Sequence, residues 1–318
     1  MHTRYGPPEV VQVTEVPPPT VKAGQLLVKV QATTVNRTDC GYRAAKPFIV
    51  RPFSGLLRPR AKVLGNEFAG EVEAVGPDVT AFAVGDRVFG YNEGPFGAHA
   101  EYMSVRAGGP VATIPDGITV EQAAASTEGS HYALSFILKV KVERGDDVLV
   151  YGATGAIGSA AVQILKSRGA TVTAVCSGEH VPLVEGLGAD RVVDYTAEDF
   201  TLDTQTYDVV LDAVGRSTFG ACKRLLKPRG TFASSDLGPL SQNPFLALAT
   251  PLLRGKRVRF PIPKIDQQTV LYLRGLLESG QFRPVIDRHY PLDDIVEAYR
   301  YVETGQKIGN VVIEVGSS

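Results

Sequence analysis

The sequence predicts a two-domain α/β protein in which a β-rich domain precedes a doubly wound domain. Up to about residue 125, short runs rich in β-branched and aromatic residues alternate with Gly, Pro and Asp, at spacings too short for crossover helices. Beyond that point, apolar strand patterns alternate with helical patterns, as they do in a parallel sheet. The chain has 318 residues, which is enough for two hydrophobic cores.

Each domain has its own run of expected elements. The first domain is expected to contain strands at residues 25–35, 69–76, 84–91 and 100–105. The second is expected to contain buried strands at 147–152, 170–176, 190–195 and 207–215, and helices at 159–169, 181–188 and 218–226. The C-terminal segment has two amphipathic helices and a closing strand, expected to pack back on the first domain, at 267–280, 292–305 and 310–315. The predicted domains are residues 1–125 with 264–318, and residues 126–263.

The composition is that of a soluble globular protein, with 44% hydrophobic and 21% charged residues. A net charge of −1 gives no general attraction to nucleic acid or to an anionic membrane. The three cysteines are scattered without CxxC spacing, which favours neither a disulfide framework nor a structural zinc lobe. The longest apolar stretch, PFLALATPLL (244–253), is about half of the ~20 residues that span a bilayer. Together with the lack of an apolar signal core, this predicts a cytoplasmic protein.

The stretch YGATGAIGSA (151–160) has glycine at every third position, between an apolar run and a helical pattern. A dinucleotide fingerprint needs small residues for a tight turn, for close approach to a pyrophosphate and for helix–strand packing; Ala153, Gly155 and Gly158 occupy those places. The alternative is a tight turn that binds nothing. Because the N–H groups that open the next helix favour an anion, the sequence predicts a Rossmann domain. Its expected cofactor contacts here are Gly152, Ala153, Thr154, Gly155, Ala156 and Ile157.

The end of the second strand decides which dinucleotide binds, because an acid there would hold a ribose 2′-hydroxyl and repel a 2′-phosphate. The strand TVTAVC is followed by Ser177, whose hydroxyl can donate to a phosphate, and then by Glu179 and His180. Ser177 therefore favours NADPH, with His180 as a second candidate for contacting the phosphate. NADH remains open, because Glu179 is close and no Arg or Lys stands beside the serine.

Several motifs, and the order of the two domains, resemble the medium-chain dehydrogenase/reductase superfamily. The motifs are the glycine stretch, VNRTD (35–39), LGNEFAGEVEAVG (64–76), VGDRVFG (84–90), LGADRVVDY (187–195) and LDAVG (211–215). The resemblance implies a GroES-like catalytic domain and a nicotinamide-dependent oxidoreductase. Zinc-dependent members carry a cysteine where this chain has Asn36 and a histidine where it has Asn66. The resemblance therefore implies an enzyme without zinc, similar to the quinone oxidoreductases.

Asn36 and Asp39 match the Asn-x-x-Asp motif of that branch, which makes both of them catalytic candidates. Hydride transfer to a quinone or an enone leaves negative charge on oxygen, and the amide of Asn36 is a candidate donor to that oxygen. The alternative is a loop residue that hydrogen-bonds its own backbone. Asp39 is interpreted as an orienting or structural carboxylate. Tyr42 stands one place later than the tyrosine of many relatives, and His131 is either a proton donor or a structural histidine.

The resemblance implies further cofactor contacts, at Thr127, Tyr195, Val214, Gly215, Ser234, Ser235, Lys307 and Asn310. Asn66, Tyr91 and Phe53 are expected to line the substrate pocket. Phe53 belongs to an apolar, arginine-containing segment (44–63) that is either a lid over a hydrophobic substrate or an ordinary long loop. Relatives have a strand before the equivalent of Arg4–Gly6, so an unpaired edge strand is expected here.

The sequence thus predicts a reductase, independent of zinc, that transfers hydride from NADPH to a quinone or an α,β-unsaturated carbonyl. Two alternatives stay open: a reductase of simple ketones or aldehydes, and a nucleotide-binding interaction protein without turnover. Neither nucleic acid nor membrane is expected as a partner. Members of the branch commonly dimerise through the edge strands of their nucleotide domains, and RVRFPIP (257–263) has the β-rich character of such an edge. A homodimer is therefore expected.

Overall fold

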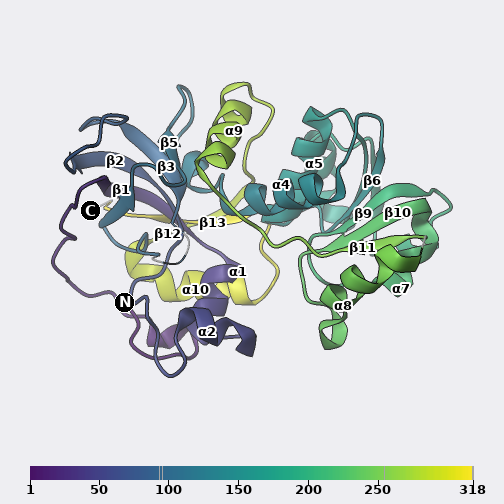
Figure 1. Ribbon diagram of the computed structural model, residues 1–318, viewed down its shortest axis with the longest axis horizontal. Helices are drawn as coiled ribbons and strands as arrows, with labels where there is room; N and C mark the ends of the chain where they lie inside the picture. Colours follow the sequence, from purple (N-terminus) through teal and green to yellow (C-terminus); the bar gives the residue numbers. More distant parts are fainter. Residues whose placement is uncertain (93, 95, 254, 317–318) are drawn as a thin grey trace. The chain divides into compact units, whose positions relative to one another are not determined.

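The chain folds into two compact units, shown in the computed structural model of Figure 1. The structure describes residues 1–92, 94, 96–253 and 255–316. One unit comprises Met1–Glu128 and Ile265–Ser318, and the other comprises Gly129–Lys264. After the two domains predicted from the sequence, we call them the catalytic unit and the nucleotide unit.

A seven-stranded sheet forms the centre of the catalytic unit, with the order β12-β13-β1-β2-β3-β5 and with β4 beside β1. Its strands are β1 (Gln25–Val35), β2 (Glu67–Val75), β3 (Arg87–Tyr91), β4 (Tyr102–Arg106), β5 (Val111–Thr113), β12 (Ile286–Pro291) and β13 (Asn310–Glu314). Described pairings are antiparallel except that of β12 with β13. Apolar residues at alternating positions of β1 place Leu26, Val28 and Val30 in the core.

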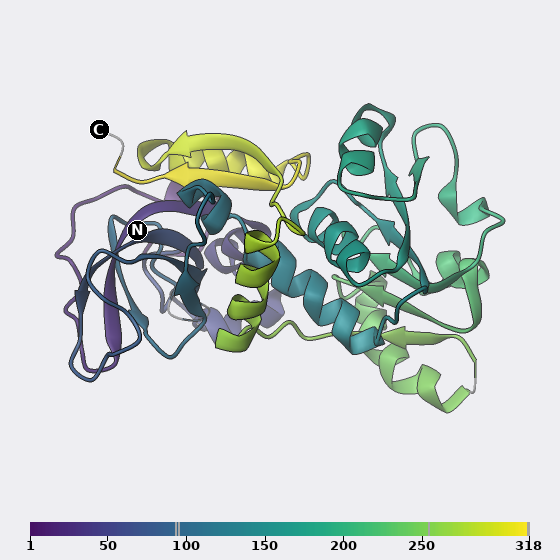
Figure 2. The same cartoon turned by 90° about the horizontal axis from the view of Figure 1, so that it is seen from above.

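The C-terminal segment returns to the N-terminal sheet, where β13 pairs with β1 in the register Ala32 opposite Glu314. Figure 2 shows the C-terminal strands and helix in yellow beside the purple N-terminal strand. The helices of this unit are α1 (Arg37–Ala44), α2 (Arg51–Ser54), α3 (Val120–Ala124), α9 (Gln267–Glu278) and α10 (Ile295–Glu303). Helix α10 packs on α1, because the buried Arg43 pairs with Glu303 and lies over the Tyr299 ring.

The nucleotide unit contains a parallel six-stranded sheet with the order β11-β10-β9-β6-β7-β8. Its strands are β6 (Asp147–Tyr151), β7 (Thr171–Cys176), β8 (Arg191–Asp194), β9 (Tyr207–Asp212), β10 (Leu226–Ser234) and β11 (Arg257–Arg259). Its helices are α4 (Glu128–Val140), α5 (Ala156–Ser167), α6 (Val181–Gly186), α7 (Phe219–Cys222) and α8 (Gln242–Ala249). The sheet grows in opposite directions from β6 and from β9, so the strand order reverses between them. Ligands of such sheets bind at the carboxyl ends of the strands at this reversal.

The predicted fold class is confirmed: a β-rich unit with a returning tail accompanies a doubly wound parallel sheet. The structure adds elements that the sequence patterns did not predict, notably α1, α8 and β12. The RVRFPIP segment forms strand only over its first three residues, as the edge strand β11. Across the described ranges, no helix combines the length and apolar character that a bilayer crossing requires.

Candidate active site

The glycine stretch forms a cradle between β6 and α5 in which two of the three glycines, Gly152 and Gly158, leave no room for a side chain. Gly152 adopts φ +83°, and a Cβ atom there would lie 2.3 Å from Val214 Cγ1. A Cβ atom on Gly158 would lie 2.1 Å from the carbonyl oxygen of Gly152, so this glycine lets the helix pack close to the strand. Gly155 is the N-cap residue of α5. Gly152 is therefore the residue whose backbone conformation at the turn requires glycine. Ala153, which the sequence analysis assigned to the first place of the fingerprint, is buried.

Asp212 organises the neighbouring turn, at the carboxyl end of β9. Its carboxylate accepts hydrogen bonds from the backbone N–H groups of Gly215 at 2.8 Å and Ser217 at 3.0 Å, and from the Ser234 hydroxyl at 3.3 Å. Burial raises the pKa of Asp212, and these donors oppose that rise. The turn that holds Val214 against the cradle thus depends on a residue that was not singled out in the sequence. A buried acid that closes an apolar strand is the signal that could have found it.

Two acids stand beside the residues predicted to select the ribose. Ser177 follows β7 and is the N-cap residue of the short 3-10 helix Gly178–His180. His180 Nε2 lies 3.4 Å from Glu179 Oε1. Gly178 approaches Asp194 so closely that a Cβ atom would lie 2.4 Å from Asp194 Oδ2. Hydrogen bonds from Thr196 hold the pKa of Asp194 below its usual range, so this carboxylate is charged at neutral pH.

In the catalytic unit, Asn36 and Asp39 form a capping box at the start of α1. The Asn36 side chain accepts from the Asp39 N–H at 3.0 Å, and the Asp39 carboxylate accepts from the Asn36 N–H at 3.1 Å. Asp39 also accepts from the Gly65 N–H at 3.0 Å. Burial, followed by the charge of Glu128, places the pKa of Asp39 well above its usual range. Asp39 therefore joins the helix start to the Gly65–Asn66 turn.

Asn66 is the centre of a buried hydrogen-bond cluster. Its Oδ1 accepts from Asn36 Nδ2 at 2.8 Å, and its Nδ2 donates to Tyr91 Oη at 2.9 Å and to Glu128 Oε2 at 3.2 Å. The structure thus brings together Asn36, Asn66 and Tyr91, and adds Glu128, which the sequence analysis did not select. Within the residues described, no group of three His, Cys, Asp or Glu side chains is placed to hold a metal ion.

Glu67 fixes the backbone that carries Thr127 and Glu128. Its Oε1 accepts from the Thr127 N–H at 3.0 Å, the Thr127 hydroxyl at 2.9 Å and the Glu128 N–H at 2.6 Å. Its Oε2 accepts from the Thr34 hydroxyl. Burial raises the pKa of Glu67, and the four donors oppose that rise.

Lys307 brings a positive charge close to these carboxyl groups. Burial lowers the pKa of Lys307, while the charges of Glu67, Glu128 and Asp287 act in the opposite direction. Its ammonium donates to the carbonyl of Gly309. Asn310, the other tail residue predicted to reach the cofactor, donates its side-chain amide to the Val285 carbonyl at 3.0 Å.

The other residues predicted for the catalytic site or substrate pocket are Tyr42, His131 and Phe53. The Tyr42 ring packs against Phe96, with ring centroids 4.7 Å apart. His131 is buried on α4, with its ring 4.7 Å from that of Tyr132. The side chain of Phe53 lies outside the part of the chain that the structure describes.

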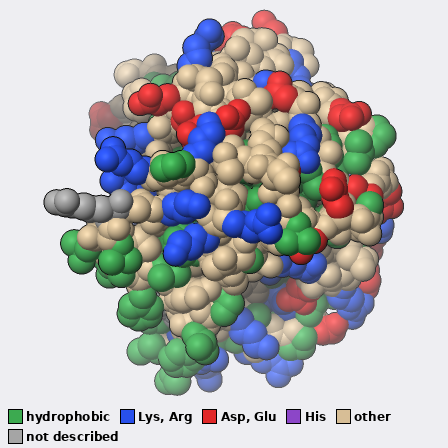
Figure 3. All heavy atoms as spheres, turned by 90° about the vertical axis from the view of Figure 1, so that its right-hand side faces the viewer, with side chains coloured by type: hydrophobic (Ala, Val, Ile, Leu, Met, Phe, Trp, Pro, Cys, Tyr) green, Lys and Arg blue, Asp and Glu red, His purple; other side chains and the backbone are tan. Residues whose placement is uncertain are grey.

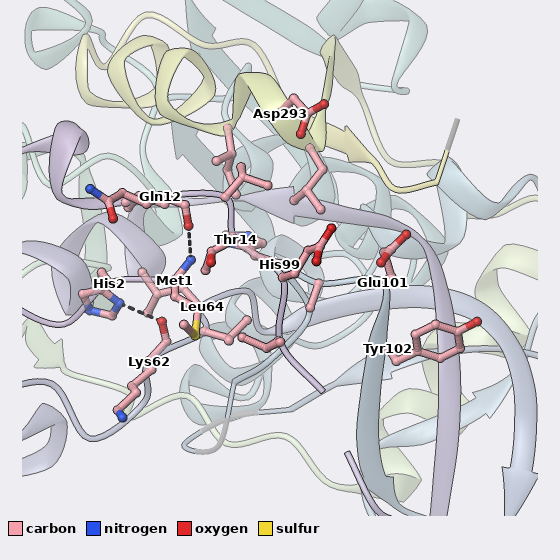
Figure 4. Close-up of a pocket in the computed structure, with 18 of the residues that line it drawn as sticks. Met1, His2, Gln12, Thr14, Lys62, Leu64, His99, Glu101, Tyr102 and Asp293 are labelled. Carbon is pink, nitrogen blue, oxygen red and sulfur yellow. Dashed lines mark hydrogen bonds between the residues drawn. The ribbon is translucent and has the colours of Figure 1, made fainter. Parts of the chain in front are cut away.

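A groove of about 560 Å³ opens in the catalytic unit (Figure 4). Figure 4 shows His2, Lys62, His99 and Asp293 around it, with the amino group of Met1 bonded to the Gln12 carbonyl. Asn36, Asn66 and Glu128 are not among its described lining residues. The groove is therefore distinct from the Asn66 cluster, and we assign no chemistry to it.

Comparison with known proteins shows the family to which this chain belongs. The chain matches the alcohol dehydrogenase GroES-like domain over residues 22–116 and the zinc-binding dehydrogenase family over residues 187–313. A quinone oxidoreductase of Pseudomonas aeruginosa is 31% identical over 327 residues, which cover 97% of each chain. The chain belongs to the medium-chain dehydrogenase/reductase superfamily, in its quinone oxidoreductase branch.

Two further relatives agree with this superfamily membership. The 2-methylene-furan-3-one reductase of Solanum lycopersicum is 31% identical over 324 residues, covering 98% of this chain and 77% of the relative. The structure of the quinone oxidoreductase from Coxiella burnetii superposes with a TM-score of 0.87 at 27% identity, covering 99% of this chain and 98% of that one. The predicted family and enzyme class are thus confirmed, and the protein is an NAD(P)H-dependent oxidoreductase of this superfamily.

Proposed function

We propose that the protein is an NADPH-preferring reductase that works without zinc and transfers hydride to a quinone or to the double bond of an α,β-unsaturated carbonyl. The observation that carries the proposal is the hydrogen bond between Asn36 and Asn66. These two positions carry amides in place of the thiolate and imidazole that bind catalytic zinc. Conjugated acceptors suit such a site, because conjugation spreads the charge that a metal would otherwise neutralise.

The nucleotide unit supplies a cradle that fits a dinucleotide. The backbone at Gly152 and Gly158 leaves no space for a Cβ atom, and helix α5 begins there with N–H groups suited to a pyrophosphate. Ser177 at the end of β7 and the Asp212-braced turn at Val214 and Gly215 would hold the ribose and the nicotinamide. When bound, the reduced nicotinamide supplies the hydride.

The catalytic unit supplies hydrogen-bond donors for the oxygen that gains charge. The Asn36 side-chain oxygen caps α1, and its Nδ2 donates one of its two N–H groups to Asn66. In this proposal Asn36 remains the candidate donor to the substrate oxygen, and it also orients Asn66, which in turn holds Tyr91 and Glu128. Preorganised donors of this kind stabilise developing charge without reorganisation during the reaction.

The preference for NADPH rests on the Ser177 hydroxyl, and the nearby carboxylates of Glu179 and Asp194 oppose it. We therefore propose only a moderate preference for NADPH over NADH. Ser177→Asp should weaken NADPH binding by about tenfold or more through charge repulsion and leave NADH binding nearly unchanged. Fluorescence titration measures the affinity of the variant for each nucleotide. Equal losses of affinity for NADPH and NADH would contradict a role for Ser177 at the phosphate.

We include homodimer formation in the proposal. Leu248, Leu252 and Leu253 are 77%, 83% and 71% exposed on α8 and the turn that follows it, next to the edge strand β11. Figure 3 views the molecule from the right-hand side of Figure 1 and shows hydrophobic side chains gathered at its lower left. Contiguous apolar surface beside a free sheet edge favours a second copy as its cover. The cytoplasmic location stays a prediction.

The experiment that tests the proposed function is nicotinamide oxidation by metal-stripped protein. NADPH and NADH are each offered with a quinone, an enone and a simple ketone. Turnover with the conjugated acceptors, insensitive to chelation and faster with NADPH, is the expected result. Turnover that appears only with added zinc, or only with the simple ketone, would contradict the proposal.

A further inference from the structure

The segment between Asp39 and Glu67 contains basic residues but no acidic residue. Its basic residues are Arg43, Lys46, Arg51, Arg58, Arg60 and Lys62. Arg43 is buried and pairs with Glu303, whereas the other cations of the segment are exposed or partly exposed. The net charge of −1 for the whole chain, on which the expectation of no membrane partner rested, conceals this local excess of positive charge.

The same segment exposes large apolar side chains. Phe48 is 76% exposed, Leu56 is 65% exposed and Leu57 is 88% exposed. The two leucines are adjacent in a loop, residues 54–60, that we call the leucine turn. Figure 1 shows α2, which leads into this turn, at the lower edge of the catalytic unit, with β1, β2 and β3 above it. Exposed apolar side chains that are surrounded by charge mark an interaction site.

The leucine turn has a fixed backbone. Gly55 adopts φ +121°, and a Cβ atom there would lie 2.1 Å from the Arg58 carbonyl oxygen, so the chain turns this tightly only at glycine. The Tyr5 hydroxyl donates to the Gly55 carbonyl at 2.6 Å. The Arg60 N–H donates to the Ser54 carbonyl at 2.8 Å and closes the loop. Because the turn is already ordered, it loses little conformational freedom when it binds a partner.

Arg51 joins the leucine turn to Phe48. Its guanidinium donates to the Leu56 carbonyl at 2.9 Å and lies 5.7 Å from the centroid of the Phe48 ring. The same guanidinium lies 5.1 Å from the centroid of the Tyr5 ring. Phe48 and the leucine turn therefore belong to one surface, which is organised around a cation.

The exposed cations of the segment have no acidic partner. Among the residues that the structure describes, Lys46, Arg58, Arg60 and Lys62 take part in no ion pair. A second copy of this chain would bring the same positive charges against them, which disfavours self-association at this surface. A nucleic acid would neutralise the charges but would leave the leucines without an apolar cover. A surface with both anionic groups and hydrocarbon complements the segment best.

We propose that the leucine turn and Phe48 dock this protein on an anionic lipid surface. The apolar side chains enter the boundary between headgroups and acyl chains, and the neighbouring cations contact the anionic headgroups. The stems of the Lys and Arg side chains lie along the apolar surface while their charged ends reach the phosphates. Lipid docking is independent of the proposed function, because it requires neither a nicotinamide cofactor nor an acceptor.

The test is sedimentation of the full chain with lipid vesicles. One set of vesicles contains phosphatidylcholine and phosphatidylserine at a ratio of about 2:1, and the other contains phosphatidylcholine alone. The double variant Leu56→Ser, Leu57→Ser removes the apolar side chains of the turn. The double variant Arg58→Gln, Arg60→Gln removes two of its charges.

Wild type is expected to bind the anionic vesicles and to bind phosphatidylcholine alone much more weakly. Removal of the two arginine charges should weaken binding to the anionic vesicles by about 30-fold. Removal of the two leucine side chains should weaken it by at least about tenfold. Raising NaCl from about 0.1 M to about 0.5 M should release wild type, because salt screens the attraction of the cations to the headgroups.

Each double variant has a matched control. Lys29→Gln with Arg106→Gln removes two exposed cations from β1 and β4. Leu138→Ser with Leu202→Ser removes two leucines that are 55% and 60% exposed. Both controls should bind the anionic vesicles as wild type does. Thermal unfolding of every variant reports on the fold.

A single fluorophore tests insertion directly, because the chain contains no tryptophan. Leu57→Trp places one indole in the leucine turn, and its emission should shift to shorter wavelength when anionic vesicles are added. Leu202→Trp, in the nucleotide unit, should show no shift. This pair of variants decides if a serine or glutamine variant fails to fold.

Three results would overturn the proposal. Wild type could fail to bind the anionic vesicles, or bind both kinds of vesicle equally. Both double variants in the leucine turn could bind as tightly as wild type. Binding could require the arginines but not the leucines and be competed away by a single-stranded oligonucleotide, which would identify a nucleic acid as the partner.

Discussion

Asn36 Nδ2 donates to Asn66 Oδ1 across 2.8 Å, which joins two amides at the positions where zinc-dependent members of the superfamily carry metal ligands. Neutral amides are poor ligands for zinc compared with thiolate and imidazole. The bond occupies Asn66 Oδ1, and the Nδ2 of the same residue serves Tyr91 and Glu128. The two asparagines therefore organise a polar cluster, and substitution of either should disturb more than one partner.

Metal removal should leave turnover unchanged, and Asn66→Ala should lower it. The alanine variant removes the donor that Tyr91 and Glu128 share, so we expect kcat/KM to fall by about 100-fold, at the lower end of the range for lost preorganised donors. Steady-state kinetics before and after chelation measure both effects. Restoration of activity by added zinc would contradict the assignment.

Gly158→Ala should destabilise the nucleotide unit and weaken dinucleotide binding. The added methyl group would lie 2.1 Å from the carbonyl oxygen of Gly152, so helix α5 must move away from the cradle. We expect a loss of about 1–3 kcal/mol in the free energy of unfolding, typical of overpacking. Denaturant unfolding measures the loss of stability, and NADPH titration measures the loss of dinucleotide affinity.

Gly186→Ala is the matched control, because a Cβ atom at this helical position would meet no atom within 4 Å. Alanine there should leave stability unchanged or raise it by up to about 1 kcal/mol. Equal effects of the two substitutions would argue against the steric account of the cradle.

The local pattern of the chain was enough to predict most strands. Residues 25–35, for example, alternate apolar and polar side chains and end before a helix cap, and β1 spans that run. Helix α1 was not predicted, because its sequence, RTDCGYRA, has little apolar periodicity and is held by the capping box of Asn36 and Asp39. Strand β12 is defined by pairing with β13, which no short pattern in IDRHYP reveals.

The candidate site was only partly predictable, for a related reason. Asn36 and Asn66 stand in recognisable motifs, but Glu128 belongs to none. Glu128 joins the cluster because Glu67, 61 residues earlier in the sequence, binds its N–H. Contacts over such separations depend on the folded chain and not on local periodicity. Asp212 is an intermediate case, because an acid at the end of an apolar strand is visible in the sequence, whereas its burial is visible only in the structure.

The exposed leucines next to β11 predict that the dimer depends on them. Replacing Leu252 and Leu253 with Asp removes two apolar anchors worth about 2 kcal/mol each, and the dissociation constant should rise at least about a hundredfold. Sedimentation velocity at micromolar concentration measures the change from dimer to monomer. Leu202→Asp, also exposed but in the 3-10 helix Phe200–Leu202, serves as the control. A wild-type chain that sediments as a monomer would overturn the prediction.

His99 should make the stability of the catalytic unit depend on pH. Burial lowers the pKa of His99 to about 4 in the folded protein. The neutral ring fits its surroundings, because Nε2 lies 2.8 Å from the Thr34 carbonyl and Nδ1 lies 3.3 Å from the Tyr299 hydroxyl. The unfolded chain binds a proton below about pH 6.5, whereas folded His99 binds one only below about pH 4. Stability should therefore fall as pH drops through this window.

The measurement is the free energy of unfolding in urea at several pH values between 6.5 and 4. The slope of the unfolding free energy against pH reports the number of protons taken up on unfolding, and His99 contributes up to about one proton to it. His99→Gln should remove that contribution, while its amide keeps a donor for the Thr34 carbonyl. His289→Gln, at an exposed histidine paired with Glu314, is the matched control and should keep the wild-type slope. If His99→Gln keeps the full slope as well, the proton uptake belongs to other groups, such as the buried His2, whose pKa is also lowered by burial.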